Sequence, residues 1–214
     1  CRVADDAIDQ QADATAALAG LDAQLTRVYA GRPAPDPIER LLAVAVRDSA
    51  LPRALLDALL EGFAWDTEGR RYDDIAALKD YAARVAGSVG VMMTLLMGER
   101  DPAVLARACD LGVAMQLTNI ARDVGQDAAA GRLYLPLDWL RAEGIHPDAW
   151  LASPVYSAAL ARVIERVLCA ADALYERATP AIAMLPRYAR ASMHAARLLY
   201  AGIGEDLRRH GHDA

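Results

Sequence analysis

Residues 116–127 read QLTNIARDVGQD, and their polar side chains recur with a helical period. Spacings of three, four and four residues separate these side chains: Gln116, Asn119, Asp123 and Asp127. They therefore share one face of a predicted helix. Apolar or small residues flank that face and turn it inward: Leu111, Ala114, Met115 and Thr118. A polar stripe is costly to bury without ligands, so the alternatives are an ordinary solvated face and a binding site.

The carboxylates of this stripe repeat a spacing that also stands at the start of the chain. Asp5 and Asp9 are four residues apart, as are Asp123 and Asp127, and both pairs lie in alanine-rich, helix-favouring stretches. Carboxylates at this spacing lie on one face of a helix and repel each other unless a cation sits between them. Two such pairs facing each other would form an oxygen-ligand site for Mg²⁺, with Mn²⁺ as the alternative metal. Magnesium commonly brings phosphates with it.

The composition is that of a helical globular protein. Of 214 residues, 55% are apolar, 24% are charged and only one is Phe, and no strand-like alternation persists. We therefore predict an all-α fold. Because no low-complexity linker interrupts the chain, we expect a single domain over residues 1–214. The net charge of −6 and the absence of a basic stripe argue against nucleic acid as a partner.

The cysteines and the hydropathy pattern bear on where the protein works. Three cysteines without a C-x-x-C pair argue against a disulfide framework or a zinc site, and they fit a reducing, cytoplasmic interior. The longest uncharged apolar stretch, residues 85–98, is shorter than the roughly 20 residues that span a bilayer. The chain begins at Cys1 rather than Met, so we expect N-terminal and C-terminal segments to be missing from it.

Hydrophobic periodicity and Gly/Pro positions predict where the helices lie. We expect breaks or loops at residues 31–37, 66–73, 127–137 and 144–147. The expected helices cover residues 1–30, 38–48, 52–65, 75–97, 101–127, 138–142, 157–178 and 186–210.

Two smaller motifs stand beside the stripe. Residues 131–136 read GRLYLP, in which Arg132 and Tyr134 could hold a diphosphate oxygen, or else form a turn with an exposed arginine. Gly87 and Gly90 fall inside a predicted helix, where glycine costs roughly 1 kcal/mol. They favour either close helix–helix packing or room for an apolar ligand against the backbone.

Taken together, these motifs resemble the squalene/phytoene synthase family, the head-to-head trans-isoprenyl diphosphate synthases, and most of all its bacterial phytoene-forming branch. The resemblance covers the whole chain in order. It rests on CRVADDAID at residues 1–9, Arg71-Tyr72, Tyr81 with VAGSVG at 85–90, QLTNIARDV at 116–124 with Asp127, and GRLYLP at 131–136. The family also has an N-terminal Ser-Phe-Ser-like contact and a C-terminal basic segment, which this chain does not contain.

The resemblance implies a fold and a set of site residues. The fold is a single-domain isoprenoid synthase, all-α, with helices around a large central cavity. Gln116 would lie near the reacting centre, and Asn119 would support the second metal-binding pair. The metal ligands would be Asp5, Asp9, Asp123 and Asp127, the diphosphate contacts Arg2, Arg122, Arg132 and Tyr134, and the prenyl-tail pocket Tyr81, Val85, Ala86 and Gly90.

The implied activity is a prenyltransferase of carotenoid biosynthesis. It would join two geranylgeranyl diphosphates through prephytoene diphosphate to 15-cis-phytoene. One alternative is a C30 synthase making dehydrosqualene, squalene or hydroxysqualene from farnesyl diphosphate; another is a non-catalytic relative. The implied partners are prenyl diphosphates, and the apolar product makes a peripheral contact with the inner membrane a reasonable expectation. The sequence leaves the oligomeric state open.

Overall fold

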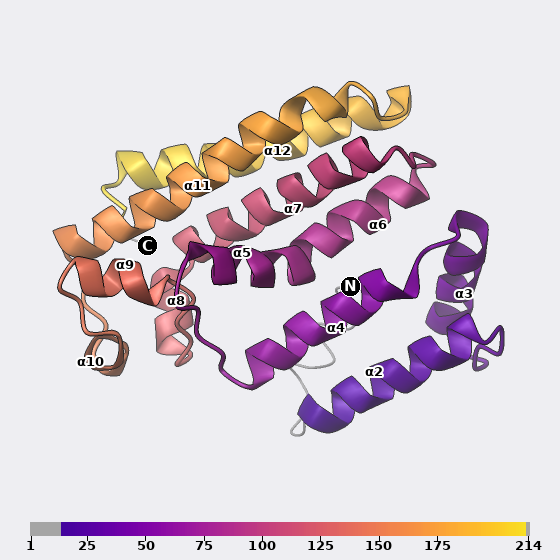
Figure 1. The fold of residues 1–214 in the computed structure, drawn as a ribbon, viewed down its shortest axis with the longest axis horizontal. Coiled ribbons are helices and arrows are strands. Elements are labelled where there is room, and N and C mark those ends of the chain that lie inside the picture. Colours follow the sequence, from indigo (N-terminus) through magenta and orange to yellow (C-terminus); the bar gives the residue numbers. More distant parts are fainter. Residues whose placement is uncertain (1–13, 213–214) are drawn as a thin grey trace.

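The structure is a computed structural model that describes residues 14–212, and within this range every regular element is a helix (Figure 1). The predicted all-α fold is thereby confirmed. The elements are α2 (Ala14–Tyr29), α3 (Pro37–Ser49), α4 (Arg53–Thr67), α5 (Ile75–Ala82), the π-helical turn η1 (Ala83–Gly87), α6 (Ser88–Leu96), α7 (Pro102–Arg122), α8 (Val124–Ala129), α9 (Leu137–Ala142), α10 (Pro147–Ala152), α11 (Ala158–Ile182) and α12 (Arg187–Arg209).

Several helices begin where a short polar side chain can cap them. Asp36 accepts hydrogen bonds from backbone N–H groups of the first turn of α3, in which Pro37 already has a helical φ. Asp101 and Pro102 repeat this arrangement at the start of α7. Ser157 caps α11 in the same way. These local signals explain why the predicted starts agree closely with the observed ones.

Helix α7 is the central element of the fold. It packs against α5, η1, α6, α11 and α12. Figure 1 shows it running between α11 and α12 on one side and the α5–α6 segment on the other, with α4 and α2 beyond. Ala114, Leu117 and Ala121 on α7 are fully buried. Because α7 is covered on several sides, one face of it stays in the interior as far as Ala121.

Glycines bring α7 very close to the segment formed by η1 and α6. A Cβ added to Gly90 would collide with the carbonyl oxygen of Ala108, and one added to Gly112 would collide with that of Ala86. A Cβ on Gly87 would lie 2.7 Å from Sγ of Cys109. The close-packing interpretation of Gly87 and Gly90 is therefore confirmed.

Outside the polar stripe, three local predictions differ from the observed structure. The helix expected over residues 75–97 contains the π-helical turn η1, which packs against both α4 and α7. Residues 147–152 form the short helix α10, which was not predicted. The loop expected to be polar contains Tyr72, whose side chain is 1% exposed. The first and third differences follow from tertiary packing, whereas α10 begins with Pro147 in its first turn, a local signal that favours a helix start.

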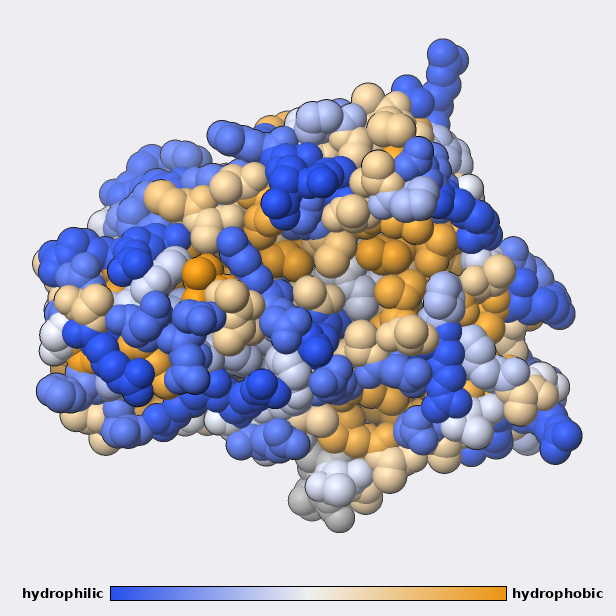
Figure 2. All heavy atoms as spheres, in the orientation of Figure 1, coloured by the Kyte–Doolittle hydropathy of each residue, from blue (hydrophilic) through white to orange (hydrophobic). Residues whose placement is uncertain are grey.

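The surface shows apolar side chains on the face seen in Figure 2. They gather around the middle of that face, at the level of α6 and α7 in Figure 1, and hydrophilic side chains border them. No helix among residues 14–212 is both long and apolar enough to cross a membrane.

Candidate active site

The polar stripe lies on two helices rather than one. Helix α7 ends at Arg122, and Asp123, with φ −101° and ψ 14°, joins it to α8. Backbone hydrogen bonds continue across the junction, from Asp123 N–H to the Asn119 carbonyl and from Asp127 N–H to the Asp123 carbonyl. The predicted continuous helix over residues 101–127 is thus wrong at Asp123. The break places the Asp123 carboxylate at a helix junction.

Asn119 carries a buried acceptor without a partner. Its Oδ1 atom is inaccessible to solvent and makes no hydrogen bond within the described residues. An unsatisfied buried acceptor of this kind costs roughly 1–3 kcal/mol. Asn119 and Gln116 both line the large cavity described below. A buried amide oxygen that has no donor among the described residues, on a side chain that lines this cavity, fits a role in holding a cation or a hydrogen-bond-donating ligand.

The two carboxylates of the second pair are in different electrostatic states. Asp123 accepts two hydrogen bonds of 2.6 Å from the guanidinium group of Arg122. Burial, together with the charge of Asp123, raises the pKa of Asp127 to about 6, although the positive charge of Arg132 opposes this rise. Among the described residues, burial and the neighbouring carboxylates therefore outweigh the positive charge near Asp127. This chemistry fits a divalent cation bound by oxygen ligands.

The expected metal site also includes the first aspartate pair. Asp5, Asp9 and Arg2 lie outside the described residues. Within residues 14–212, no three His, Cys, Asp or Glu side chains are close enough together to hold a metal ion. The donors that fit the expected metal are therefore Asn119, Asp123 and Asp127.

The raised pKa of Asp127 predicts a pH-dependent stability. The folded chain holds the Asp127 proton more tightly than the unfolded chain, whose carboxyl has its ordinary pKa near 3.8. The resulting stabilisation is complete below pH 3.8 and disappears as the pH rises through about 6. In metal-free buffer, Asp127→Asn should therefore be more stable than the wild type at neutral pH and equally stable near pH 3.8. Urea unfolding at both values tests this, and an equal difference at both would contradict it.

The GRLYLP segment returns the chain to the aspartates. Gly131 has φ +74°, a left-handed conformation that glycine adopts easily. The following residue, Arg132, donates its backbone N–H to the Asp127 carbonyl at 2.8 Å. Leu133 and Leu135 are buried and anchor the segment. The arginine and the tyrosine of this motif thus lie directly beside the second aspartate pair.

Tyr134 belongs to a cluster of aromatic rings at this end of the fold. Its ring stacks against those of Tyr72 and Tyr81, with centroids 6.2 and 5.4 Å apart. The hydroxyl groups of Tyr134 and Tyr81 both donate to Asp66, at 2.8 and 2.9 Å. Asp66 was absent from the residues selected by sequence. Its neighbours in the sequence, Trp65 and the nearby Tyr72, do not indicate a function.

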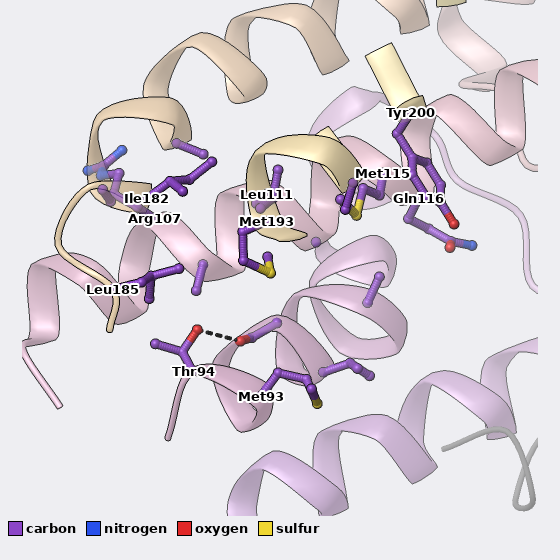
Figure 3. A pocket seen from close by; sticks show the side chains of 18 of the residues that line it. Met93, Thr94, Arg107, Leu111, Met115, Gln116, Ile182, Leu185, Met193 and Tyr200 are labelled. Atoms are coloured by element: carbon purple, nitrogen blue, oxygen red, sulfur yellow. Dashed lines mark hydrogen bonds between the residues drawn. The ribbon is translucent and has the colours of Figure 1, made fainter. Parts of the chain in front are cut away.

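An apolar cavity of about 340 Å³ extends along α7, away from Gln116 and Asn119 (Figure 3). It lies between α6, α7, α11 and α12. Val85, Ala86 and Gly90 line it, as the resemblance implied, whereas Tyr81 is not part of its wall. Sequence reasoning did not select the contributions from α11 and α12. Its other larger lining residues include Met93, Met97, Val104, Arg107, Leu111, Met115, Ile182, Leu185, Met193 and Tyr200.

The two ends of the cavity differ: one carries the side-chain amides of Gln116 and Asn119, and the other is apolar except for Arg107, which pairs with Asp110. Figure 3 shows Gln116 beside Tyr200 at one end and Leu185 near Arg107 and Ile182 at the other. Along α7, Asn119 marks the polar end and Val104 the apolar end. The Thr94 hydroxyl donates a 2.9 Å hydrogen bond to the Gly90 carbonyl, so its proton is not available to a ligand in the cavity. The arrangement suits an extended apolar molecule with an anionic head beside the aspartates.

The same fold occurs in a solved squalene synthase from Alicyclobacillus acidocaldarius. The two chains align with a TM-score of 0.91 and 27% sequence identity, over 99% of this chain and 80% of that one. The family model described as squalene/phytoene synthase matches residues 1–214, and the chain belongs to this family.

Two curated relatives are similar over the whole length of the chain. They are phytoene synthases from Cereibacter sphaeroides and Rhodobacter capsulatus, and each is 50% identical to it over 100% of this chain. The chain spans 63% and 64% of their respective lengths.

Proposed function

We propose that this protein is a phytoene synthase, a prenyltransferase of carotenoid biosynthesis that condenses two geranylgeranyl diphosphates head to head. The observation that carries the proposal is a long apolar cavity that ends at Gln116 and Asn119, beside Asp123 and Asp127. The full-length similarity to two phytoene synthases supports it. We further propose that residues 1–214 form one catalytic domain.

The length of the cavity favours a C20 tail over a C15 tail. Val104 and Asn119 both line it and are 119 − 104 = 15 residues apart on α7, which corresponds to about 22 Å of helix. A prenyl tail advances about 1.25 Å per main-chain bond when built from carbon–carbon bonds near 1.5 Å. The tail of geranylgeranyl diphosphate then extends about 20 Å, and that of farnesyl diphosphate about 15 Å. The longer tail makes fuller use of the wall.

The proposed chemistry assigns separate tasks to the two ends. Asp123, Asp127 and Asn119, with Asp5 and Asp9, would hold Mg²⁺, which neutralises charge on the departing diphosphate when it is bound. Arg122, Arg132 and Tyr134 would bind the diphosphate oxygens, and Gln116 would lie near the reacting carbons. The first ionisation releases diphosphate and leaves an allylic cation. The second substrate's double bond attacks this cation, and loss of a proton closes the cyclopropane ring of prephytoene diphosphate. A second ionisation, rearrangement and proton loss then give phytoene.

The apolar wall protects these cations. Val85, Ala86 and Leu111 present only hydrocarbon to the cavity, so water that would capture a carbocation is kept out. The product, which has lost both diphosphates, is a hydrocarbon and is therefore strongly apolar. We therefore propose that the protein is cytoplasmic and delivers its product through a peripheral contact with the inner membrane.

A product assay tests this function. The chain is incubated with Mg²⁺ and either geranylgeranyl or farnesyl diphosphate, and the extracted hydrocarbons are identified by mass. We expect a C40 product from the first substrate. A C30 product alone would favour the alternative suggested by the similarity to a squalene synthase. Absence of Mg²⁺-dependent diphosphate release with both substrates would favour a non-catalytic relative.

Filling the apolar end should change substrate preference. Ala181 lines the cavity and is packed with Val104 and Leu185, so Ala181→Leu removes space where the last isoprene unit would lie. We expect the ratio of kcat/KM for the C20 substrate over the C15 substrate to fall by at least about 10-fold. The matched control is Ala183→Leu, two residues further along, which is exposed and outside the cavity wall. An unchanged ratio in Ala181→Leu would contradict the assignment of this end.

A further inference from the structure

Asp66 joins three separate segments through its carboxylate. It lies in the last turn of α4, and its Oδ2 accepts a 2.9 Å hydrogen bond from the hydroxyl of Tyr81 in α5. Its Oδ1 accepts a 2.8 Å hydrogen bond from the hydroxyl of Tyr134 in the GRLYLP segment. Each oxygen therefore orients a different phenol. Hydrogen bonds to a charged group are the stronger kind, so this contact holds the segments firmly.

Both phenols are kept in the form that can donate. Burial, followed by the negative charge of Asp66, raises the pKa of Tyr81 and of Tyr134 above their ordinary value. The Tyr81 side chain is 3% exposed, so water does not compete for its hydroxyl. With its proton directed to Asp66, each phenol leaves its oxygen lone pairs for other neighbours. The carboxylate thus fixes the direction of both hydroxyl groups.

The segment fixed in this way is also the one beside the aspartates. Tyr134 is two residues after Arg132, whose backbone N–H is bonded to the Asp127 carbonyl at 2.8 Å. The negative charge of Asp66 acts on Asp127 as well, so the carboxylates lie within electrostatic range of each other. Stacking of Tyr134 on Tyr72 and Tyr81 locks the ring plane but leaves the hydroxyl direction to Asp66.

We infer that Asp66 is a positioning residue for the anionic end of the site: by holding the phenols of Tyr81 and Tyr134, it keeps residues 131–136, and with them Arg132, in place to bind the substrate's diphosphate. This inference rests on the proposed function, because it supposes a diphosphate at that end. It assigns a role to a residue that is not among those lining the cavity.

The test measures binding of inorganic diphosphate in the presence of Mg²⁺ by calorimetry. Asp66→Asn retains the shape of the side chain but replaces one acceptor oxygen with an N–H donor, so it can accept only one phenol. We expect affinity to fall by about 10–100-fold, as for other residues that orient a binding group indirectly. The matched control is Asp57→Asn on the same helix, where the exposed carboxylate pairs with Arg53. It should bind diphosphate like the wild type.

A second pair of variants separates positioning from general destabilisation. Tyr134→Phe keeps the stacked ring and removes one donor to Asp66, and it should weaken diphosphate binding without unfolding the chain. If Asp66 acts through the phenols, the double variant Asp66→Asn/Tyr134→Phe loses less than the sum of the two single losses. If Asp66→Asn does not fold, the deciding variant is Tyr81→Phe, because Tyr81 donates to Asp66 at 2.9 Å and is not assigned to the diphosphate. Weakened diphosphate binding by Tyr81→Phe supports the inference, and unchanged binding overturns it.

The outcomes distinguish the two levels of the proposal. If Asp66→Asn bound diphosphate as tightly as the wild type, the positioning role alone would be overturned. The same would follow if the loss of affinity in the double variant equalled the sum of the losses in the two single variants. A wild-type chain that binds no diphosphate would overturn the proposed function, and this inference with it.

Discussion

The Asp123→Ala variant is expected to lose Mg²⁺-dependent turnover by at least about 100-fold while retaining its fold. The loss follows because removing one preorganised group that acts on developing charge typically costs that much. The fold should survive because Asp123 is partly exposed and lies at a helix junction rather than in the core. Its removal also relieves repulsion with Asp127. Steady-state kinetics and a thermal melt of the same sample measure both parts.

The chain offers a closely matched control for this variant. Arg47 and Asp48 form an ion pair between adjacent residues near the end of α3, as Arg122 and Asp123 do at the end of α7. Asp48→Ala therefore breaks the same kind of pair far from the site and should leave turnover unchanged. Full activity of Asp123→Ala, or its unfolding under conditions where Asp48→Ala is stable, would contradict the assigned role.

Gly112→Ala is expected to destabilise the fold by about 2–3 kcal/mol, the cost of overpacking a well-packed interface. The added Cβ would lie 2.7 Å from the carbonyl carbon of Ala86 and 2.9 Å from Cα of Gly87. These are backbone atoms, so no side chain can rotate away, and η1 and α7 would have to separate. Urea unfolding monitored by circular dichroism measures the change.

Gly202→Ala is the control for this prediction. Gly202 lies within α12, and a Cβ there would meet nothing within 4 Å. Alanine favours a helix over glycine by about 1 kcal/mol, so this variant should be slightly more stable than the wild type. If Gly112→Ala were as stable as Gly202→Ala, the close approach of η1 and α7 would be wrong.

Local sequence signals predicted most of the helical structure. Alanine-rich periodic segments, with caps such as Asp101 and Ser157, determine where the long helices begin, and these signals lie within a few residues of each helix start. The break at Asp123 was missed because backbone hydrogen bonds continue across it, so the helical period of the side chains continues too. The π-helical turn at Ala83–Gly87 was missed because it depends on packing against α4 and α7.

Some residues of the candidate site could likewise be predicted from local sequence, and others could not. Gln116, Asn119 and Asp127 could be selected because they recur at helical spacing within one segment. Asp66 could not, since its partners are Tyr81 and Tyr134, which are distant in sequence and share no motif with it. The cavity wall from α11 and α12 was missed for a similar reason: its residues are ordinary apolar side chains, and only the packing of helices makes them line a cavity.

The most direct test of the proposed function is a competition between substrates. The chain is given equal concentrations of geranylgeranyl and farnesyl diphosphate with Mg²⁺, and the masses of all hydrocarbon products are compared. A cavity that follows α7 from Asn119 to Val104 predicts that the C40 hydrocarbon phytoene predominates. Predominance of a C30 hydrocarbon, or no hydrocarbon at all, would contradict the proposal.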